Sequence, residues 1–243
     1  MSQPHAESRT LIAEDLLLLL MDDEKGRLAA ASYAQPLFGG ALLAELALDG
    51  AVEVEEKRGM WHTAKVHAVH PPAGGAAPDP LLARAWEVVA EKPRTAQGLV
   101  DRLGRGVRKE LQDRLVARGI LERRETKILG LFPSTTWPAV DVQHEQQVRA
   151  SLRDCLVIGL MPTPRTAALV ALLAAVDQAY KVLAPGDLTS QRGELSPREV
   201  KRRAKAITEG DWAAKAVRDA VAASQAAIST AVMVSTTTAA TST

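Results

Sequence analysis

The amino-acid sequence predicts a mainly α-helical fold: a single globular helical domain with a central buried helix core, small β-elements and one protruding β-hairpin. Apolar residues make up 47% of the 243 positions and aromatic residues only 3%, so leucine and alanine supply most of the core. Both residues favour helices, because they lose little side-chain entropy there. The segment 165–183 is apolar on nearly all sides, which is typical of a helix at the centre of a domain.

The N-terminal third is expected to hold two buried helices and a small β-element. Their expected ranges are helices over 10–21 and 37–48 and strands over 52–54 and 65–70. The helices are apolar at nearly every position, whereas the strands alternate apolar and polar residues. Residues 1–9 are expected to form a disordered lead. The Pro- and Gly-rich segment 71–80 predicts a loop, and it is the one candidate for an internal boundary.

The rest of the chain predicts a series of helices and one β-hairpin. The helices are expected over 81–90, 95–103, 105–118, 142–160, 165–183, 197–207 and 212–228, and the hairpin strands over 120–123 and 127–132. The clearest start signal runs from Ser196 to Glu199, where Ser is the N-cap, Pro the first helical residue and Glu the partner in a capping box. Residues 10–228 then form the domain, and residues 229–243 form a flexible tail.

Positive charge is concentrated between Arg102 and Lys127. This segment holds nine Lys or Arg and four Asp or Glu, a balance of 9 − 4 = +5, against +1 for the whole chain. An apolar run follows it directly, and its members are Ile128, Leu129, Leu131 and Phe132. A basic surface beside an apolar strand suits an anionic and partly apolar partner, such as a membrane surface.

The predicted helix 105–118 has one polar and one apolar face. The polar sector holds Arg105, Arg108, Lys109 and Gln112. The opposite sector holds Leu103, Val107 and Leu111. Two Arg side chains spaced i, i+3 can bind phosphate oxygens bidentately, so the pair is a candidate phosphate clamp. The alternative is a solvated face with i, i+4 ion pairs, such as Lys109 with Asp113, beside a hairpin that packs on the domain.

A second hypothesis is a winged-helix regulator that binds DNA, since three short helices precede the hairpin. Helix 105–118 would then be the recognition helix and residues 123–127 the wing. Four acids in the basic segment and an overall charge near zero count against duplex binding. A third hypothesis is a protein-interaction scaffold. The hairpin could equally pair two subunits into a homo-oligomer.

No enzyme active site is recognisable, so we expect no catalytic residue, no cofactor and no metal. The clustered histidines are His62, His67 and His70. A strand would place the middle one on the opposite face from the others, which disfavours a shared metal. The single Cys155 excludes an intrachain disulfide and is expected in the core. The run Lys201-Arg202-Arg203 is expected to be a solvated helix face.

The N-terminus shows no signal peptide, and the apolar run 16–21 is too short to span a bilayer. A cytoplasmic protein is therefore expected, and one that touches a membrane from a single side.

Four segments occur in a fixed order with compatible spacing. They are residues 10–26, 39–50, 105–121 with the apolar hairpin after it, and 165–183. This set resembles the Golgi phosphoprotein 3 family, whose members are peripheral membrane proteins that bind phosphatidylinositol 4-phosphate. The resemblance spans about residues 10–220 and implies a lipid-binding protein that acts as an adaptor for protein clients. The Ala- and Arg-rich composition fits a bacterial, in particular actinobacterial, member.

The resemblance also implies a site. Arg105 and Arg108 match two Arg residues of the family's lipid pocket, and Lys109 beside them is a third candidate for head-group binding. Ala30 and Gly39 stand where the family's pocket has a Trp and an Arg, so we expect binding of anionic phospholipid head groups, with phosphatidylinositol 4-phosphate or a related phosphoinositide implied by the family. The expected location is peripheral, on the inner face of the membrane. The residues expected to insert from the hairpin are Ile128, Leu129, Leu131 and Phe132.

Overall fold

The computed structural model describes residues 10–22, 27–55, 64–72, 79–128, 132–190, 193–213 and 215–240. The helices are α1 (Ile12–Leu20), α2 (Ala34–Leu48), α3 (Pro80–Ala90), α4 (Ala96–Leu103), α5 (Val107–Ala117), α6 (Gln143–Arg153), α7 (Pro164–Ala175), α8 (Pro197–Glu209) and α9 (Lys215–Ala240). The strands are β1 (Val52–Val54), β2 (Lys65–Ala68), β3 (Arg94–Thr95), β4 (Arg124–Ile128), β5 (Phe132–Thr136), β6 (Thr189–Ser190) and β7 (Gly193–Glu194).

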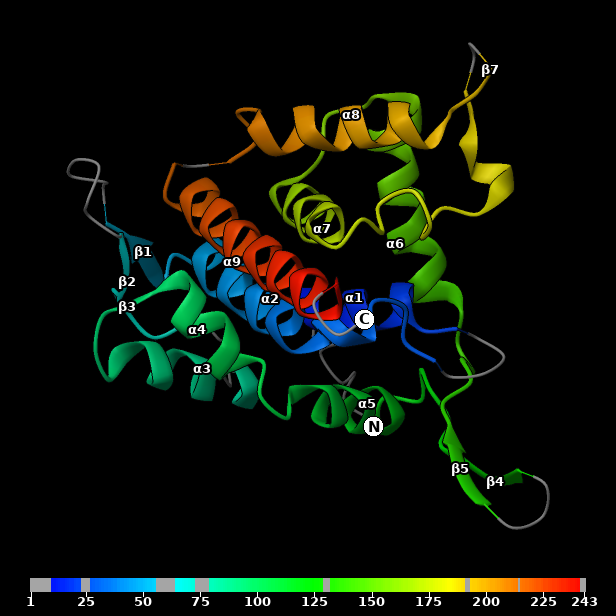
Figure 1. The fold of residues 1–243 in the computed structure, drawn as a ribbon, viewed down its shortest axis with the longest axis horizontal. Coiled ribbons are helices and arrows are strands. Elements are labelled where there is room, and N and C mark those ends of the chain that lie inside the picture. The colour runs from blue at the N-terminus through cyan, green and yellow to red at the C-terminus, as the bar shows by residue number, and fades with distance from the viewer. Residues whose placement is uncertain are drawn as a thin grey trace, which may run out of the picture.

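The predicted mainly α-helical class is confirmed. Figure 1 shows the helices gathered around α2 and α9, with the β4–β5 hairpin projecting from one end of the body. The strands β1, β2 and β3 form a small antiparallel sheet, and β4–β5 and β6–β7 are separate two-stranded hairpins. The capping box predicted at Ser196 is present, because Ser196 Oγ accepts from the Glu199 amide and the Glu199 side chain accepts from the Ser196 amide.

Helix α2 lies at the centre of the core. Residues 36–47 are all buried, since leucine, alanine and glycine cover every side of this helix. Helices α1, α4, α7 and α9 pack directly against it. Helix α7 is also buried over residues 167–173, which confirms the predicted central helix in position. The predicted length is wrong, because the helix ends at Ala175 and Asp177 turns the chain with a φ of 55°.

The last predicted helix also has different bounds. Helix α9 runs from Lys215 to Ala240, past the predicted end at residue 228. Neither glycine nor proline occurs after residue 214, so the sequence holds no strong helix breaker there. The predicted lead 1–9 lies outside the described residues, and the flexibility of the tail remains a prediction.

A buried ionic cluster joins four helices. The guanidinium of Arg165 on α7 donates to Asp15 of α1 at 2.8 Å and to Glu45 of α2 at 2.7 Å. Nε2 of His144 on α6 lies 2.8 Å from the other oxygen of Asp15. Burial alone would raise the pKa of Asp15, but the interactions with His144 and Arg165 outweigh it and lower this pKa below its ordinary value. The cluster therefore favours a charged, hydrogen-bonded Asp15 inside the core and pairs Glu45 with the same guanidinium.

We predict that Arg165→Met lowers the free energy of unfolding by about 3 kcal/mol, because it leaves two buried carboxylates without their cation. Urea unfolding followed by circular dichroism measures the change. Lys109→Met is the control, since it removes the exposed ion pair between Lys109 and Asp113 and should cost less than about 0.5 kcal/mol. An unfolding midpoint for Arg165→Met equal to that of the wild type would contradict a stabilising cluster.

Candidate functional site

The structure divides the predicted helix 105–118 into a turn and a shorter helix. Residues 104–106 form the turn after α4, and α5 begins at Val107. Gly106 is the N-cap of α5 and has a φ of 74°, a left-handed conformation that glycine adopts without steric cost. The predicted placement of Arg105 and Arg108 on one helical face is therefore wrong. Instead, Arg105 lies in the turn, Arg108 lies in the first turn of α5, and the two flank the start of the helix.

The start of α5 is open and uncapped. Gly106 offers no side-chain oxygen to the first amides of the helix. A Cβ placed on Gly106 would meet no atom of the described residues within 4 Å, so this position faces open space. Helix N-termini carry partial positive charge and unpaired N–H groups, which favour anions.

Arg105 and Arg108 have no carboxylate partner among the described residues. Arg105 is exposed and Arg108 is half-buried, and neither makes an ion pair or side-chain hydrogen bond with the described part of the chain. By contrast, Lys109 donates to Asp113 at 2.7 Å, as the solvated-face alternative predicts. Glu110 is the acid closest in sequence to Arg108 on α5, but it accepts a hydrogen bond from Arg84 at 2.5 Å. Two guanidinium groups beside a helix N-terminus form an arrangement that can bind phosphate.

The C-terminal half of α5 has a structural role. Arg114 donates to Glu14 of α1 at 2.9 Å and to Asp79 before α3 at 2.6 Å. Arg118 donates to the same Glu14, which is fully buried, at 3.3 Å. Burial alone would lower the pKa of Arg114, but the hydrogen bonds to Asp79 and Glu14 raise it above its ordinary value. These two cations hold α5 on the body and are not available to a ligand.

Other cations of the segment are paired as well. The pairs are Arg102 with Glu91, Arg123 with Glu125 and Arg124 with Glu122. The excess of +5 counted along the sequence therefore does not appear as a broad basic face in the described part of the chain. Among the cations of this segment whose side chains the structure describes (Lys127 is not one of them), Arg105 and Arg108 are the two without an ion pair.

Gln112 is buried, whereas helical periodicity places it on the exposed face of α5. The predicted apolar residues Leu103, Val107 and Leu111 are buried, which confirms that face. Gln112 was expected among the exposed cations, yet it is only 4% exposed and its Nε2 has no hydrogen-bond partner in the described structure. A polar residue at a buried position carries no sequence signal, because helical periodicity assigns it to the solvent.

The hairpin strands pair from Arg124 with Thr136 to Ile128 with Phe132. The predicted strands 120–123 and 127–132 are wrong, because the chain reverses within the predicted second strand. Of the four residues expected to insert into a membrane, Ile128 and Phe132 form the last pair of the ladder. The other two, Leu129 and Leu131, lie outside the described residues. The two described residues of the apolar run thus lie at the end of the strand ladder of the hairpin that projects from the body (Figure 1).

A family model described as Golgi phosphoprotein 3 (GPP34) matches residues 12–224 of the chain. The chain belongs to the Golgi phosphoprotein 3 family. No curated protein matched it. The family is known for binding phosphatidylinositol 4-phosphate at the Golgi and for a non-enzymatic adaptor role. The resemblance inferred from four sequence segments is therefore confirmed.

Position 39 has no room for a side chain. A Cβ on Gly39 would lie 1.9 Å from the carbonyl oxygen of Val100, because α2 and α4 touch backbone to backbone there. The reciprocal contact is as tight, with a Cβ on Gly104 1.7 Å from the carbonyl oxygen of Gln35. An Arg side chain, which the Golgi phosphoprotein 3 resemblance would place at position 39, has no room. The same contact sets the turn that carries Arg105 against the first turns of α2.

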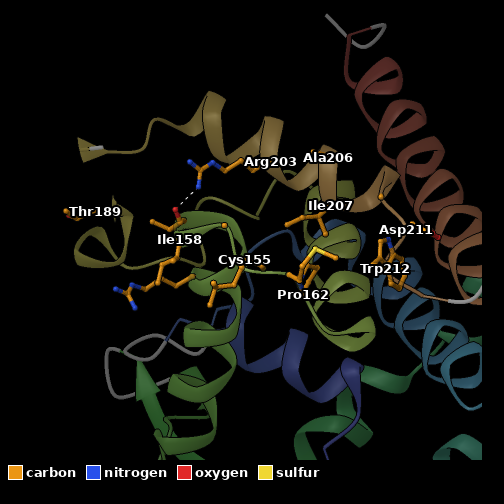
Figure 2. Close-up of a pocket in the computed structure, with 15 residues that line it drawn as sticks. Cys155, Ile158, Pro162, Thr189, Arg203, Ala206, Ile207, Asp211 and Trp212 are labelled. Atoms are coloured by element: carbon orange, nitrogen blue, oxygen red, sulfur yellow. Dashed lines mark hydrogen bonds between the residues drawn. The ribbon is translucent and has the colours of Figure 1, made fainter. Parts of the chain in front are cut away.

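One cavity away from α5 lies between α8 and the segment that follows α6. Figure 2 shows this cavity of about 820 Å³, with Cys155, Ile207 and Trp212 among its lining residues. Cys155 is buried, as predicted, and burial raises the pKa of its thiol to about 11. The thiol is therefore protonated at neutral pH and is a poor nucleophile.

The histidine cluster is not a site in the described structure. His67 lies 2.5 Å from Glu55, His70 Nδ1 donates to the carbonyl oxygen of its neighbour Pro71, and His62 lies outside the described residues. Within the described ranges no group of His, Cys, Asp and Glu residues could hold a metal ion. No helix in the same ranges is long and apolar enough to cross a membrane.

We predict that Gly39→Ala lowers the free energy of unfolding by at least about 2 kcal/mol, because its Cβ would force α2 and α4 apart. Thermal and urea unfolding measure the effect. Gly98→Ala, in the same helix pair, is the matched control. Its Cβ would only touch Thr95 Oγ1 at 3.4 Å, and replacing a helical glycine should stabilise the protein by about 0.5–1 kcal/mol. Equal effects of the two substitutions would show that the close contact does not limit position 39.

Proposed function

We propose that this protein binds anionic phospholipid head groups at a membrane surface, with phosphatidylinositol 4-phosphate or a related phosphoinositide as the ligand suggested by its family. Arg105 and Arg108 contact the phosphate, and Lys109 assists. The observation that carries the proposal is the pair of guanidinium groups at the open N-terminus of α5 that form no ion pair with any residue in the described part of the chain. Lys109 is paired only with Asp113 on the surface, where an ion pair contributes little, so it can exchange that partner for a lipid phosphate.

Two cations are too few to hold the protein tightly. Each Lys or Arg near an anionic surface contributes about 1 kcal/mol. Insertion of apolar side chains must supply the rest, at about 1.5–3 kcal/mol for each fully buried large residue. The apolar hairpin end supplies this part of the binding, through Ile128, Leu129, Leu131 and Phe132. The protein then acts as a peripheral protein on the cytoplasmic face of the membrane, where it can recruit protein clients as an adaptor.

The winged-helix alternative has one supporting observation, the order of α3, α4, α5 and the hairpin. The ion pairs of α5 count against it. A recognition helix needs several free cations along a duplex, whereas Arg114 and Arg118 are held by buried carboxylates. Duplex DNA is therefore a ligand to compare with vesicles, and we do not expect it to bind tightly.

We predict that Arg105→Ala with Arg108→Ala weakens binding to vesicles by about 30-fold, the loss expected for two surface cations of about 1 kcal/mol each. Co-sedimentation with phosphatidylcholine vesicles that contain 5% phosphatidylinositol 4-phosphate measures it, with phosphatidylserine vesicles and duplex DNA as parallel arms. Arg198→Gln with Arg202→Gln is the control, because it removes the same charge from another helix. Unchanged vesicle binding by the α5 variant would refute the head-group assignment, and tight duplex binding would favour the alternative.

The hairpin makes a separate prediction. Leu129→Ser with Leu131→Ser should weaken vesicle binding at least tenfold without changing its salt dependence, because apolar insertion is not screened by ions. The α5 variant should instead bind with a shallower salt dependence. Wild-type affinity of the serine variant would show that the hairpin stays out of the bilayer.

A further inference from the structure

The cations of helix α8 fall into two groups that make different contacts. The sequence predicts a solvated face for Lys201-Arg202-Arg203, and for Arg203 this is wrong. Its Nη1 donates to the carbonyl oxygens of Leu156 at 3.0 Å and Val157 at 2.6 Å, so it fastens α8 to the end of the α6 segment. Lys201 and Arg202 are exposed, as predicted, and belong to a different face of the helix.

The exposed cations form a stripe along a groove. Its members recur at i, i+3, i+4 and i+7 and are Arg198, Lys201, Arg202 and Lys205. The groove has a volume of about 1240 Å³ and lies between α8, the segment after α7 and the side chain of Gln225 on α9. Its lining surface is mostly apolar and includes Ala174, Ala179, Tyr180 and Ala204. The result is a concave apolar floor with a cationic wall.

The charges of this groove are not balanced from within. The lining holds five cations and three acids, a balance of 5 − 3 = +2; the cations are Lys181, Arg198, Lys201, Arg202 and Lys205. The acids are all engaged. Glu199 caps α8 through Ser196, Asp177 lies 3.3 Å from Lys201, and Glu209 lies 3.8 Å from Lys205. Three cations, Lys181, Arg198 and Arg202, make no ion pair with any described residue.

We infer that this groove binds an acidic amphipathic helix of a partner protein. The stripe from Arg198 to Lys205 covers seven residue steps, about 10.5 Å at the helical rise of 1.5 Å per residue. Carboxylates at i, i+3 or i+4 and i+7 of a second helix repeat over the same length and can face the stripe. The apolar face of that helix then covers the alanine and tyrosine floor, as in other helix-in-groove complexes.

The shape of the groove favours a protein segment over a bilayer. A membrane surface is broad and meets protruding cations, whereas these cations line a cavity whose surface is mostly apolar. The position of the groove is consistent with a site separate from the one at α5. Figure 1 shows α8 on one side of the α2–α9 core and α5 with the hairpin on the other. A protein held on a membrane through α5 would thus present α8 away from it.

The test uses a fluorescein-labelled 16-residue helical peptide with glutamates at i, i+3, i+4 and i+7 and leucines on the opposite face. Two control peptides have the same composition in scrambled order, or glutamine in place of glutamate. Binding to the full chain is followed by fluorescence anisotropy at 150 mM salt. We expect the patterned peptide to bind about tenfold more tightly than either control, and Arg198→Gln with Arg202→Gln to abolish this preference.

The charge-matched control is Arg105→Ala with Arg108→Ala, which should leave peptide binding unchanged. Circular dichroism checks that both variants are folded; both alter exposed or half-exposed side chains. Equal binding of the patterned and scrambled peptides, or an equal loss in the two variants, would overturn the inference. So would a loss of vesicle binding, but not of peptide binding, in the α8 variant, because the stripe would then serve a membrane. Measuring vesicle binding of both variants distinguishes a failure of the groove proposal from a failure of the lipid proposal at α5.

Discussion

Two neighbouring carboxylates of α1 are carried into the interior, and the packing of the domain depends on the cations that meet them. Glu14 is reached by Arg114 and Arg118 of α5, whereas Asp15 is reached by Arg165 of α7 and His144 of α6. A buried carboxylate that loses its partner costs several kcal/mol. Helices α5, α6 and α7 must therefore be in place together before α1 can be buried.

This requirement decides which arginines remain for a ligand. Along α5 the C-terminal cations Arg114 and Arg118 are tied to the body by carboxylates, whereas Arg105 and Arg108 at its start form no ion pair with any described residue. Helix α8 shows the same separation, with Arg203 bonded to backbone carbonyls and Arg198 and Arg202 facing a groove. In both helices the number of cations in the sequence is larger than the number of cations available to a ligand at the surface. The candidate sites lie where the cations take no part in structural ion pairs or backbone hydrogen bonds.

The sequence predicted what local patterns can encode. Apolar periodicity located α1, α2 and the apolar face of α5, and the capping box at Ser196 fixed the start of α8. The reversal of the hairpin was misplaced, because the apolar run after Lys127 is typical of a continuing strand and holds only one glycine as a turn signal. Ion pairs such as Glu14 with Arg114 join residues 100 positions apart. Such pairs produce no pattern among neighbouring residues of the sequence. The sequence therefore could not predict which cations form ion pairs.

The separation between these partners also bears on the order in which the protein can fold during synthesis. Helix α1 leaves the ribosome well before α7, because Arg165 lies 150 positions after Asp15. Contacts at such separations form late, because a long loop must close first. Until α7 has emerged, Asp15 on the leucine-rich helix α1 lacks its arginine partner, so the apolar surface of α1 stays exposed to aggregation over that interval of synthesis.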